Sequence, residues 1–507
     1  MKKVFIALSS ILCLSISLCG QTVQLDANNV RALIPSNPIL FWTGSGSPVF
    51  NVPKSGTKNP VFTSTLWVGG MSNSNLYLAA ETYRQNGNKD FQSGPVSTAT
   101  LNPAGWAVVK VDKSIVDAYK TDSTLWLNPP AVFLNWPAHG DSASQEAKNL
   151  APFVNVGGDP EKYEPQFGDY PAIKGDQCTY YIFNDNLTHT ESQGNSLGIE
   201  VHRMVYEISD TVNSFLNNTV FVEYKLFNRS DRNYDSLWIT AYSDFDLGNF
   251  NDDYIGTDSA LNMTYVYNGL ASDDGPNGYG ANPPAAGMVL LNHPLTSSMF
   301  YTNDNTNTGN PASTTEYWNY MNGRWRDGTA LTYGDSGNTG SSRAYFAFSG
   351  NPCDSSGWSE RAVGMTPGDR RILGTTLFRN VYAGNDVSVV LAYVYAQDIG
   401  FDASLCKLKT EALALTNWYK QQPQTGLVEQ NQLTNLFQVY PNPSAGMFQL
   451  DMLQGSLSIT VFDIAGKVLL TKKTDTQHMQ LEIPQAGMYW ILAENEKGKQ
   501  VRKVVVY

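Results

Sequence analysis

Short apolar and aromatic runs, bounded by Gly, Pro, Asn and Asp, recur from residue 21 to residue 420, a region called the passenger below. Examples are STLWVGGM at 64–71, TVFVEYKLFN at 219–228, SLWITAYSDFDL at 236–247 and VSVVLAYVYAQ at 387–397. β-Branched and aromatic residues favour strands, and turn residues between short runs are typical of antiparallel sheets. We therefore predict an all-β, antiparallel β-sandwich passenger, as one domain or as two parts, 21–210 and 211–420.

One segment of the passenger has helical spacing. In ASLCKLKTEALALTNWYK, at 403–420, apolar residues recur every three or four positions. They are Leu405, Leu408, Ala412, Leu415 and Tyr419. This spacing places them on one face of an α-helix, so we predict one C-terminal helix that packs against a sheet.

A second set of strand-like runs fills residues 435–507. The runs are MFQLDML, SLSITVFDIAG, KVLLTKK, MQLEIP, MYWILAE and VRKVVVY. Turn residues separate them at intervals of roughly 8 to 12 residues, which is the spacing of a sandwich. The polar segment 421–434 precedes them. We predict a linker at 421–434 and a small Ig-like β-sandwich at 435–507.

The first 20 residues are typical of a secretory signal peptide. Lys2 and Lys3 precede the apolar stretch Val4–Leu18. That stretch is shorter than the roughly 20 residues that a membrane-spanning helix needs. No other stretch approaches this length, so we expect signal-peptide-dependent export and no transmembrane span.

The balance of charged residues argues against one class of binding partner. The chain has 34 Lys+Arg and 46 Asp+Glu, for a net charge of −12. Residues 1–20 contribute +2 and residues 435–507 contribute +1, which leaves −15 for residues 21–434. A nucleic-acid-binding surface is basic, so this composition argues against nucleic acid as a partner.

The tail contains three motifs in a recognisable order: YPNP at Tyr440–Pro443, FDIAGK at Phe462–Lys467 and AGMY at Ala486–Tyr489. Together with the basic and apolar end of the chain, they resemble the type A C-terminal sorting domain of the type IX secretion system of Bacteroidetes. The resemblance implies that the secretion machinery and its sorting peptidase act through residues 435–507. It also implies a final location that is secreted or on the outer cell surface, after outer-membrane translocation.

The passenger also contains segments that are similar to those of a known group of proteins. Examples are ILFWTGSGSPVFNVPKSG at 39–56 and NRSDRNYDSLWITAYSDFDLGNFNDDYIGTD at 228–258. They resemble large β-rich proteins that Bacteroidetes export by the type IX system and whose function is undefined. The resemblance covers most of residues 28–400. It implies a location and no particular reaction.

An acidic loop follows one predicted strand, within SDFDLGNFNDDYIGTD. Its carboxylates are Asp244, Asp246, Asp252, Asp253 and Asp258. Five carboxylates in so short a segment repel one another unless water or a cation neutralises them. We predict a structural Ca²⁺ here; a solvated acidic loop and a catalytic carboxylate pair are the alternatives.

A second acidic loop, VNVGGDPEKYEPQFGDYP at 154–171, offers further oxygen ligands. They come from Asn155, Asp159, Glu161 and Asp169. Because Ca²⁺ takes six to eight oxygens, we predict a second structural ion in this loop. Pro160 interrupts the run and lowers the expected affinity, and a surface loop closed by Asx-turns is the alternative.

Other motifs point to catalysis only weakly, and no catalytic residue is predicted. Gly334–Gly337 resembles the nucleophile loop of chymotrypsin-like proteases, but the upstream His139 lies in an unrelated context, WPAHG. The segments His189–Glu191 and Glu200–His202 each place a histidine and a glutamate two positions apart. If their strands were neighbours they could hold a metal; hydrogen-bonded or exposed histidines are the alternative.

Two further features leave alternatives open. After the signal segment, Cys178, Cys353 and Cys406 allow one disulfide with a free thiol, or no disulfide. The aromatic segment EYWNYMNGRWRDGTALTY at 316–333 is compatible with a glycan-binding surface, but packing in the core and loops is the favoured explanation.

The patterns together favour a secreted or cell-surface β-sandwich protein with a structural, adhesive or binding role and Ca²⁺ as a stabiliser. Its ligand would be a surface polysaccharide or a protein. An enzyme is not favoured. The alternatives are a secreted hydrolase acting on polysaccharide or protein, and a glycan-binding module.

Overall fold

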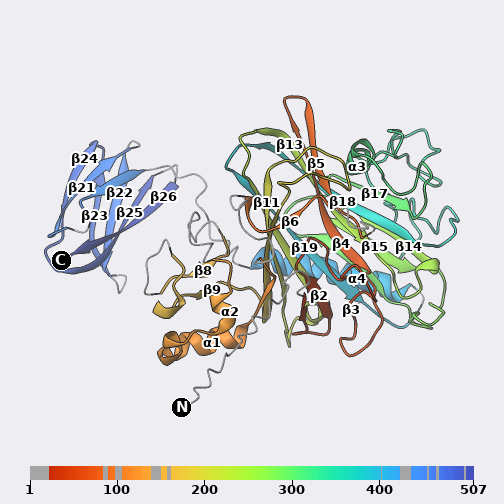
Figure 1. Cartoon of the computed structure of the whole chain (residues 1–507), viewed down its shortest axis with the longest axis horizontal. Helices are drawn as coiled ribbons and strands as arrows, with labels where there is room; N and C mark the ends of the chain where they lie inside the picture. The colour runs from red at the N-terminus through yellow and green to blue at the C-terminus, as the bar shows by residue number, and fades with distance from the viewer. Residues whose placement is uncertain are drawn as a thin grey trace, which may run out of the picture. The chain divides into compact units, whose positions relative to one another are not determined.

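The computed structural model describes most of the chain. The described residues are 22–83, 89–96, 106–138, 150–156, 162–400, 402–422, 436–442, 444–453, 456–463, 467–495 and 498–507. The chain divides into two compact units, Met1–Tyr419 and Lys420–Tyr507 (Figure 1). The predicted signal peptide at 1–20 and nearly all of the predicted linker at 421–434 lie outside the described residues.

Two antiparallel sheets make up most of the first unit. The five-stranded sheet has the order β17 (Ser297–Thr302), β18 (Arg370–Val381), β13 (Tyr234–Asp244), β4 (Thr63–Ser72) and β5 (Asn75–Ala80). The larger, nine-stranded sheet has the order β14 (Asp253–Asp258), β15 (Met263–Asn268), β16 (Ala285–Leu290), β19 (Asp386–Ala396), β12 (Thr219–Asn228), β11 (Ile199–Glu207), β10 (Gln177–Asn184) and β6 (Gln92–Ser93), and β7 (Val109–Asp112) also pairs with β10. The prediction of an all-β, antiparallel fold class is confirmed: the structure is mostly β, with antiparallel sheets and few helices.

Smaller elements surround these sheets. The short strands are β1 (Thr22–Leu25), β2 (Arg31–Pro35), β3 (Phe50–Asn51), β8 (Phe153–Val154) and β9 (Tyr170–Pro171). The α-helices of the described residues are α1 (Lys113–Thr121), α2 (Ala131–Leu134), α3 (Thr314–Met321) and α4 (Ala403–Gln421). The last of these confirms the helix that the apolar spacing predicted.

The nine-stranded sheet is buried on both faces. Along β12, Val220 and Val222 face the core shared with the five-stranded sheet, whereas Phe221 faces a second core that includes residues of α1 and α4. Successive side chains of a strand point to opposite faces, so these strands read as continuous apolar runs. The boundary predicted near residue 210 falls between β11 and β12, which are hydrogen-bonded neighbours, and the division of the passenger there stays a prediction.

The five-stranded sheet is also covered on its outer face. On that face, a Cβ at Gly69 of β4 would lie 2.9 Å from the Trp318 ring of α3; on the opposite face of the strand, a Cβ at Gly70 would lie 2.6 Å from the Tyr234 ring. The two glycines therefore allow aromatic side chains to lie directly on the strand. Beside them, Trp67 is fully buried and stacks on Tyr242.

A disulfide joins Cys353, in the long loop before β18, to Cys406 of α4, with their Cα atoms 5.7 Å apart. Cys178 is buried in β10 as a free thiol. The alternative of one bridge and one free thiol is the one that the structure contains. The bridge attaches α4 to a loop that also covers the five-stranded sheet.

Replacing both bridged cysteines, C353S with C406S, is expected to destabilise the first unit by about 4 kcal/mol. A cross-link that spans 53 residues restricts the unfolded chain, and loop-closure entropy gives a cost of this size. Urea unfolding measures it. Thiol titration of the denatured, unreduced wild type after signal-peptide removal should count one thiol, and a count of three would contradict the bridge.

The second unit is a small two-sheet structure. One sheet has the order β20 (Phe437–Tyr440), β21 (Met447–Met452) and β24 (His478–Glu482); the other has the order β23 (Val468–Thr474), β22 (Leu457–Asp463), β25 (Gly487–Asn495) and β26 (Gly498–Val506). It has a core of its own, to which Phe448, Ile459 and Ile491 belong. Among the described residues of both units, no helix is long and apolar enough to cross a membrane.

Candidate metal centre

The candidate centre lies where β13 and β18 pair at one end of the five-stranded sheet. Asp244 is the last residue of β13 and is paired in register with Arg371 of β18. Asp246 follows in the loop after β13, and Asp369 lies just before β18. One carboxylate oxygen from each of the three aspartates lies within 4.8 Å of the others. These three residues, called the aspartate triad below, could hold a metal ion.

One buried guanidinium lies against the aspartate triad. The side chain of Arg371 is 3% exposed; its Nη2 lies 3.1 Å from Asp244 Oδ2 and its Nη1 lies 2.6 Å from Asp369 Oδ1. Burial by itself would lower the pKa of Arg371, but the charges of Asp244 and neighbouring groups outweigh it and raise that pKa. Three carboxylates against one guanidinium leave two excess negative charges.

Asp244 and Asp369 form ion pairs with Arg371, so Asp246 carries part of this excess. Burial and the adjacent charges of Asp244 and Asp369 raise the pKa of the Asp246 carboxyl well above its ordinary value. A carboxyl in such surroundings either takes up a proton or binds a cation, because a bare buried charge is costly. The triad is therefore suited to hold a hard, oxygen-preferring cation.

Two more of the sequence-predicted aspartates lie nearby. Asp253, at the start of β14, is 2% exposed, and its Oδ2 accepts a hydrogen bond of 2.9 Å from the backbone N–H of Leu247. Within the described residues its buried Oδ1 has no hydrogen-bond partner, and the same holds for Oδ1 of Asp252. Burial raises the pKa of the Asp253 carboxyl well above its ordinary value, and the negative charge of Asp246 adds to this rise. Burial and Asp273 raise the pKa of Asp252 to about 6.

Asp258 lies apart from this group. It ends β14, about 17 Å from Asp253 at the rise of an antiparallel strand. Its Oδ2 forms an ion pair of 2.9 Å with Nζ of Lys409 in α4. Asp258 therefore already has a cationic partner, supplied by the protein.

The second acidic loop, at 154–171, is organised around Asp169, which is fully buried. Its carboxylate accepts hydrogen bonds from the backbone N–H of Val156 at 2.8 Å and of Glu164 at 2.9 Å. The Asn155 side-chain amide donates to it as well, at 3.2 Å. These donors satisfy the buried carboxylate, and their hydrogen bonds hold the loop closed. Asp159 and Glu161 lie outside the described residues, and the second calcium ion stays a prediction.

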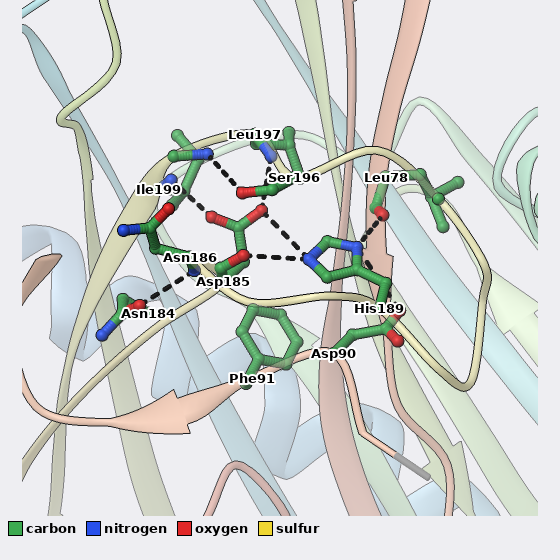
Figure 2. A network of polar contacts seen from close by, with 12 residues as sticks. Leu78, Asp90, Phe91, Asn184, Asp185, Asn186, His189, Ser196, Leu197 and Ile199 are labelled. Carbon is green, nitrogen blue, oxygen red and sulfur yellow. Dashed lines mark hydrogen bonds and ion pairs between the residues drawn. The ribbon is translucent and has the colours of Figure 1, made fainter. Parts of the chain in front are cut away.

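His189 lies in a buried polar network rather than at a metal site (Figure 2). Its Nδ1 lies 2.7 Å from the carbonyl oxygen of Leu78 and its Nε2 lies 2.9 Å from that of Asp185. Carbonyl oxygens only accept hydrogen bonds, so a ring nitrogen that bonds to one of them acts as a donor and not as a metal ligand. The carboxylates of Asp185 and Asp90 lie 3.6 Å and 3.9 Å from the ring. Both nitrogens are therefore in use.

His202 is likewise hydrogen-bonded inside the fold. Its Nε2 lies 2.9 Å from Oε1 of Glu200, and its Nδ1 lies 2.9 Å from the hydroxyl of Tyr180. Burial by itself would raise the pKa of Glu200, but the hydrogen bond with His202 and the charge of Arg229 contribute to lowering it to about 2. The hydrogen-bonded alternative describes both histidines.

The aromatic segment at 316–333 belongs mainly to the core. Tyr317, Tyr320 and Trp325 are buried, and Trp67 packs edge-on against Tyr317. Tyr333 is the large aromatic of this segment that is exposed, at 51%. Packing, rather than a glycan-binding face, explains this cluster.

The family model described as "Secretion system C-terminal sorting domain" matches residues 438–507. The match covers nearly all of the second unit, including the YPNP, FDIAGK and AGMY motifs. The second unit is a type IX secretion sorting domain. The sorting domain implies recognition by the type IX machinery and translocation of the chain across the outer membrane, to the surface or the medium.

Comparison with solved structures shows distant likenesses. A polysaccharide lyase is 11% identical, with 61% of this chain and 34% of the lyase covered and a TM-score of 0.19. PorZ, a surface component of the type IX secretion system of Porphyromonas gingivalis, is 11% identical, with 67% of this chain and 45% of PorZ covered and a TM-score of 0.13. The chain thus spans about a third of the lyase and less than half of PorZ. No curated protein matches the chain.

The sequence pointed to Asp244 and Asp246 but missed Asp369 and Arg371. Both missed residues lie in GDRRILG, more than 120 positions after Asp246. The only local signal was an aspartate followed by two arginines at the start of an apolar strand. That signal gains meaning only when β18 is paired with β13.

Proposed function

We propose that the chain is a type IX-exported β-sandwich protein with a structural, adhesive or binding role outside the cell, and that Ca²⁺ at the aspartate triad stabilises it. The sorting domain supports the export. The observation that carries the metal proposal is the convergence of three carboxylates, two of which pair with a single guanidinium, because it leaves an excess charge of two that a divalent cation balances.

Calcium suits this arrangement better than a transition metal does. All the candidate ligands are carboxylate oxygens, whereas zinc and copper sites use histidine nitrogen or cysteine sulfur. Three carboxylates can supply three to six of the six to eight oxygens that Ca²⁺ takes. Water or a ligand would supply the remainder.

Chelation tests the proposal. EGTA is expected to lower the melting temperature of the first unit in the purified full-length protein, and added Ca²⁺ to restore it. At a Ca²⁺ concentration one hundred times the dissociation constant, the stabilisation is about 2.7 kcal/mol. Differential scanning calorimetry measures the shift, and elemental analysis counts the ion.

Two aspartate variants sharpen the test. D246N is expected to abolish the Ca²⁺ response and to raise stability in EGTA, because it removes a metal ligand and one of the two excess negative charges. D258N is the matched control: it alters the same acidic loop but lies at the far end of β14, so the Ca²⁺ response should remain. A melting temperature that ignores Ca²⁺ and EGTA, with no ion found, would refute the metal centre.

A further inference from the structure

Three partly buried aromatic rings lie together beside the aspartate triad. They are Trp42, which follows β2, Phe62, which precedes β4, and Tyr83, which follows β5. The ring centroids lie 5.3 Å apart for Trp42 and Phe62, 5.8 Å for Trp42 and Tyr83, and 5.3 Å for Phe62 and Tyr83. We call these three residues the aromatic trio. Three connecting segments of the chain thus build one aromatic cluster.

The aromatic trio is in direct contact with the residues of the metal centre. The hydroxyl of Tyr83 accepts a hydrogen bond of 2.5 Å from Nη2 of Arg371, whose guanidinium also lies 5.3 Å from the centre of the Tyr83 ring. The backbone N–H of Phe62 donates to the carbonyl oxygen of Asp244 at 2.9 Å. The same arginine therefore contacts the aromatic trio on one side and two carboxylates of the triad on the other.

Packing does not account for the exposed part of the trio. Neighbouring aromatic residues of the same size, Trp67 and Tyr242, are completely buried, whereas all three members of the trio keep part of their surface in solvent. The indole of Trp42 is also fixed in orientation, since its Nε1 donates a hydrogen bond of 2.9 Å to the carbonyl oxygen of Gly46 in an exposed turn. A rigid, partly exposed aromatic surface of this kind is typical of a ligand contact.

The metal centre adds a second, independent indication of a ligand. The buried Asp253, whose Oδ1 lacks a hydrogen-bond partner in the described part of the chain, accepts a hydrogen bond of 2.9 Å at its Oδ2 from the backbone N–H of Leu247, the residue after Asp246. The partly exposed Asp246 and Asp369 border the same region. A cation held there would keep coordination positions open to oxygen atoms of a bound molecule.

We propose that the aromatic trio and the aspartate triad form one binding site for a neutral saccharide, whose ring stacks on the aromatic faces while vicinal hydroxyls coordinate the bound Ca²⁺. This inference rests on the metal centre of the proposed function. The C–H groups of a sugar ring are drawn to the negative face of an aromatic ring, and hydroxyl oxygens are hard ligands that suit Ca²⁺.

The net charge of the occupied site indicates whether a neutral or an anionic saccharide would bind. A divalent cation brings the sum of the three carboxylates and Arg371 to zero, so the occupied site has no net positive charge to attract an anion. Residues 21–434, with a charge of −15, repel polyanions. Neutral glycans are therefore favoured over uronate-rich ones. The competing occupant is an ammonium group, which aromatic rings and carboxylates could hold without a metal.

Calorimetric titration of the full-length protein tests the proposal. The probes are laminarin, mannan and xylan as neutral glycans, polygalacturonate as the anionic one, and an oligolysine peptide. In Ca²⁺ at least one neutral glycan should bind, and EGTA should weaken that binding at least tenfold. W42A should weaken it at least tenfold while keeping the rise in melting temperature on Ca²⁺ addition, which shows an intact fold and metal centre. Y333A, which removes an exposed aromatic of another segment, should leave the affinity unchanged.

The outcomes separate the two proposals. If Ca²⁺ raises the melting temperature but none of the three neutral glycans binds, the saccharide site is overturned and the metal centre stands. Unchanged affinity in W42A, preference for polygalacturonate, or metal-independent binding of oligolysine would each overturn it too. If Ca²⁺ has no effect on melting, the metal centre fails and the saccharide site fails with it.

Discussion

Deleting residues 435–507 is expected to leave the protein unexported across the outer membrane. These residues contain the whole sorting domain, which has a hydrophobic core separate from that of the first unit. The deletion therefore removes the element that the type IX machinery recognises without taking apart the cores of the passenger. Fractionation of cells and medium, with detection of the passenger, measures the result.

The melting temperature of the truncated passenger is the control for this experiment. It should match that of the first unit in the full-length protein, because that unit is compact without the tail. Lost export with an unchanged melting temperature assigns the effect to sorting rather than to misfolding. Normal surface display or secretion of the truncated chain would refute the sorting role.

Replacing Arg371 with leucine, R371L, is expected to destabilise the first unit by about 3–5 kcal/mol in the absence of Ca²⁺. The substitution leaves Asp244, Asp246 and Asp369 without the one guanidinium that compensates them, and removing one partner of a buried ion pair costs this much. Urea unfolding followed by tryptophan fluorescence measures the change. The signal reports the first unit, since every tryptophan except Trp490 precedes residue 420.

A second arginine provides the control. R361L removes an ion pair with Asp402 in which the two side chains are 26% and 42% exposed, so a loss of about 1 kcal/mol or less is expected. Ca²⁺ should recover more stability in R371L than in the wild type, because the variant has three uncompensated charges instead of two. Equal losses in the two variants would contradict the electrostatic account of the centre.

Most of the fold could be predicted from local sequence patterns. The apolar runs that became β4, β12, β13 and β19 and the three-and-four spacing that became α4 depend only on neighbouring residues. The tail motifs likewise lie within a continuous stretch of the chain, and the family match confirmed them. Short-range information was sufficient because strand and helix periodicities differ.

The candidate site could be predicted only in part. Asp244 and Asp246 were found because they are two positions apart in one acidic loop. Closeness in the sequence also placed Asp258 in this group. In the structure, Asp258 lies at the far end of β14, where it pairs with Lys409. Likewise the aromatic segment at 316–333 was conspicuous because its residues are consecutive, yet the structure buries most of them.

The sequence by itself determined the element types, the acidic character of the passenger and the sorting domain, since each of these follows from residues that are close in the chain. The tertiary structure decided which charges and rings meet. Pairing of β13 with β18 brings Arg371 and Asp369 to Asp244 and Asp246, and Trp42, Phe62 and Tyr83 come together from three separate connecting segments. Strand register and sheet packing set these contacts, and they depend on the burial of the whole core rather than on any local pattern.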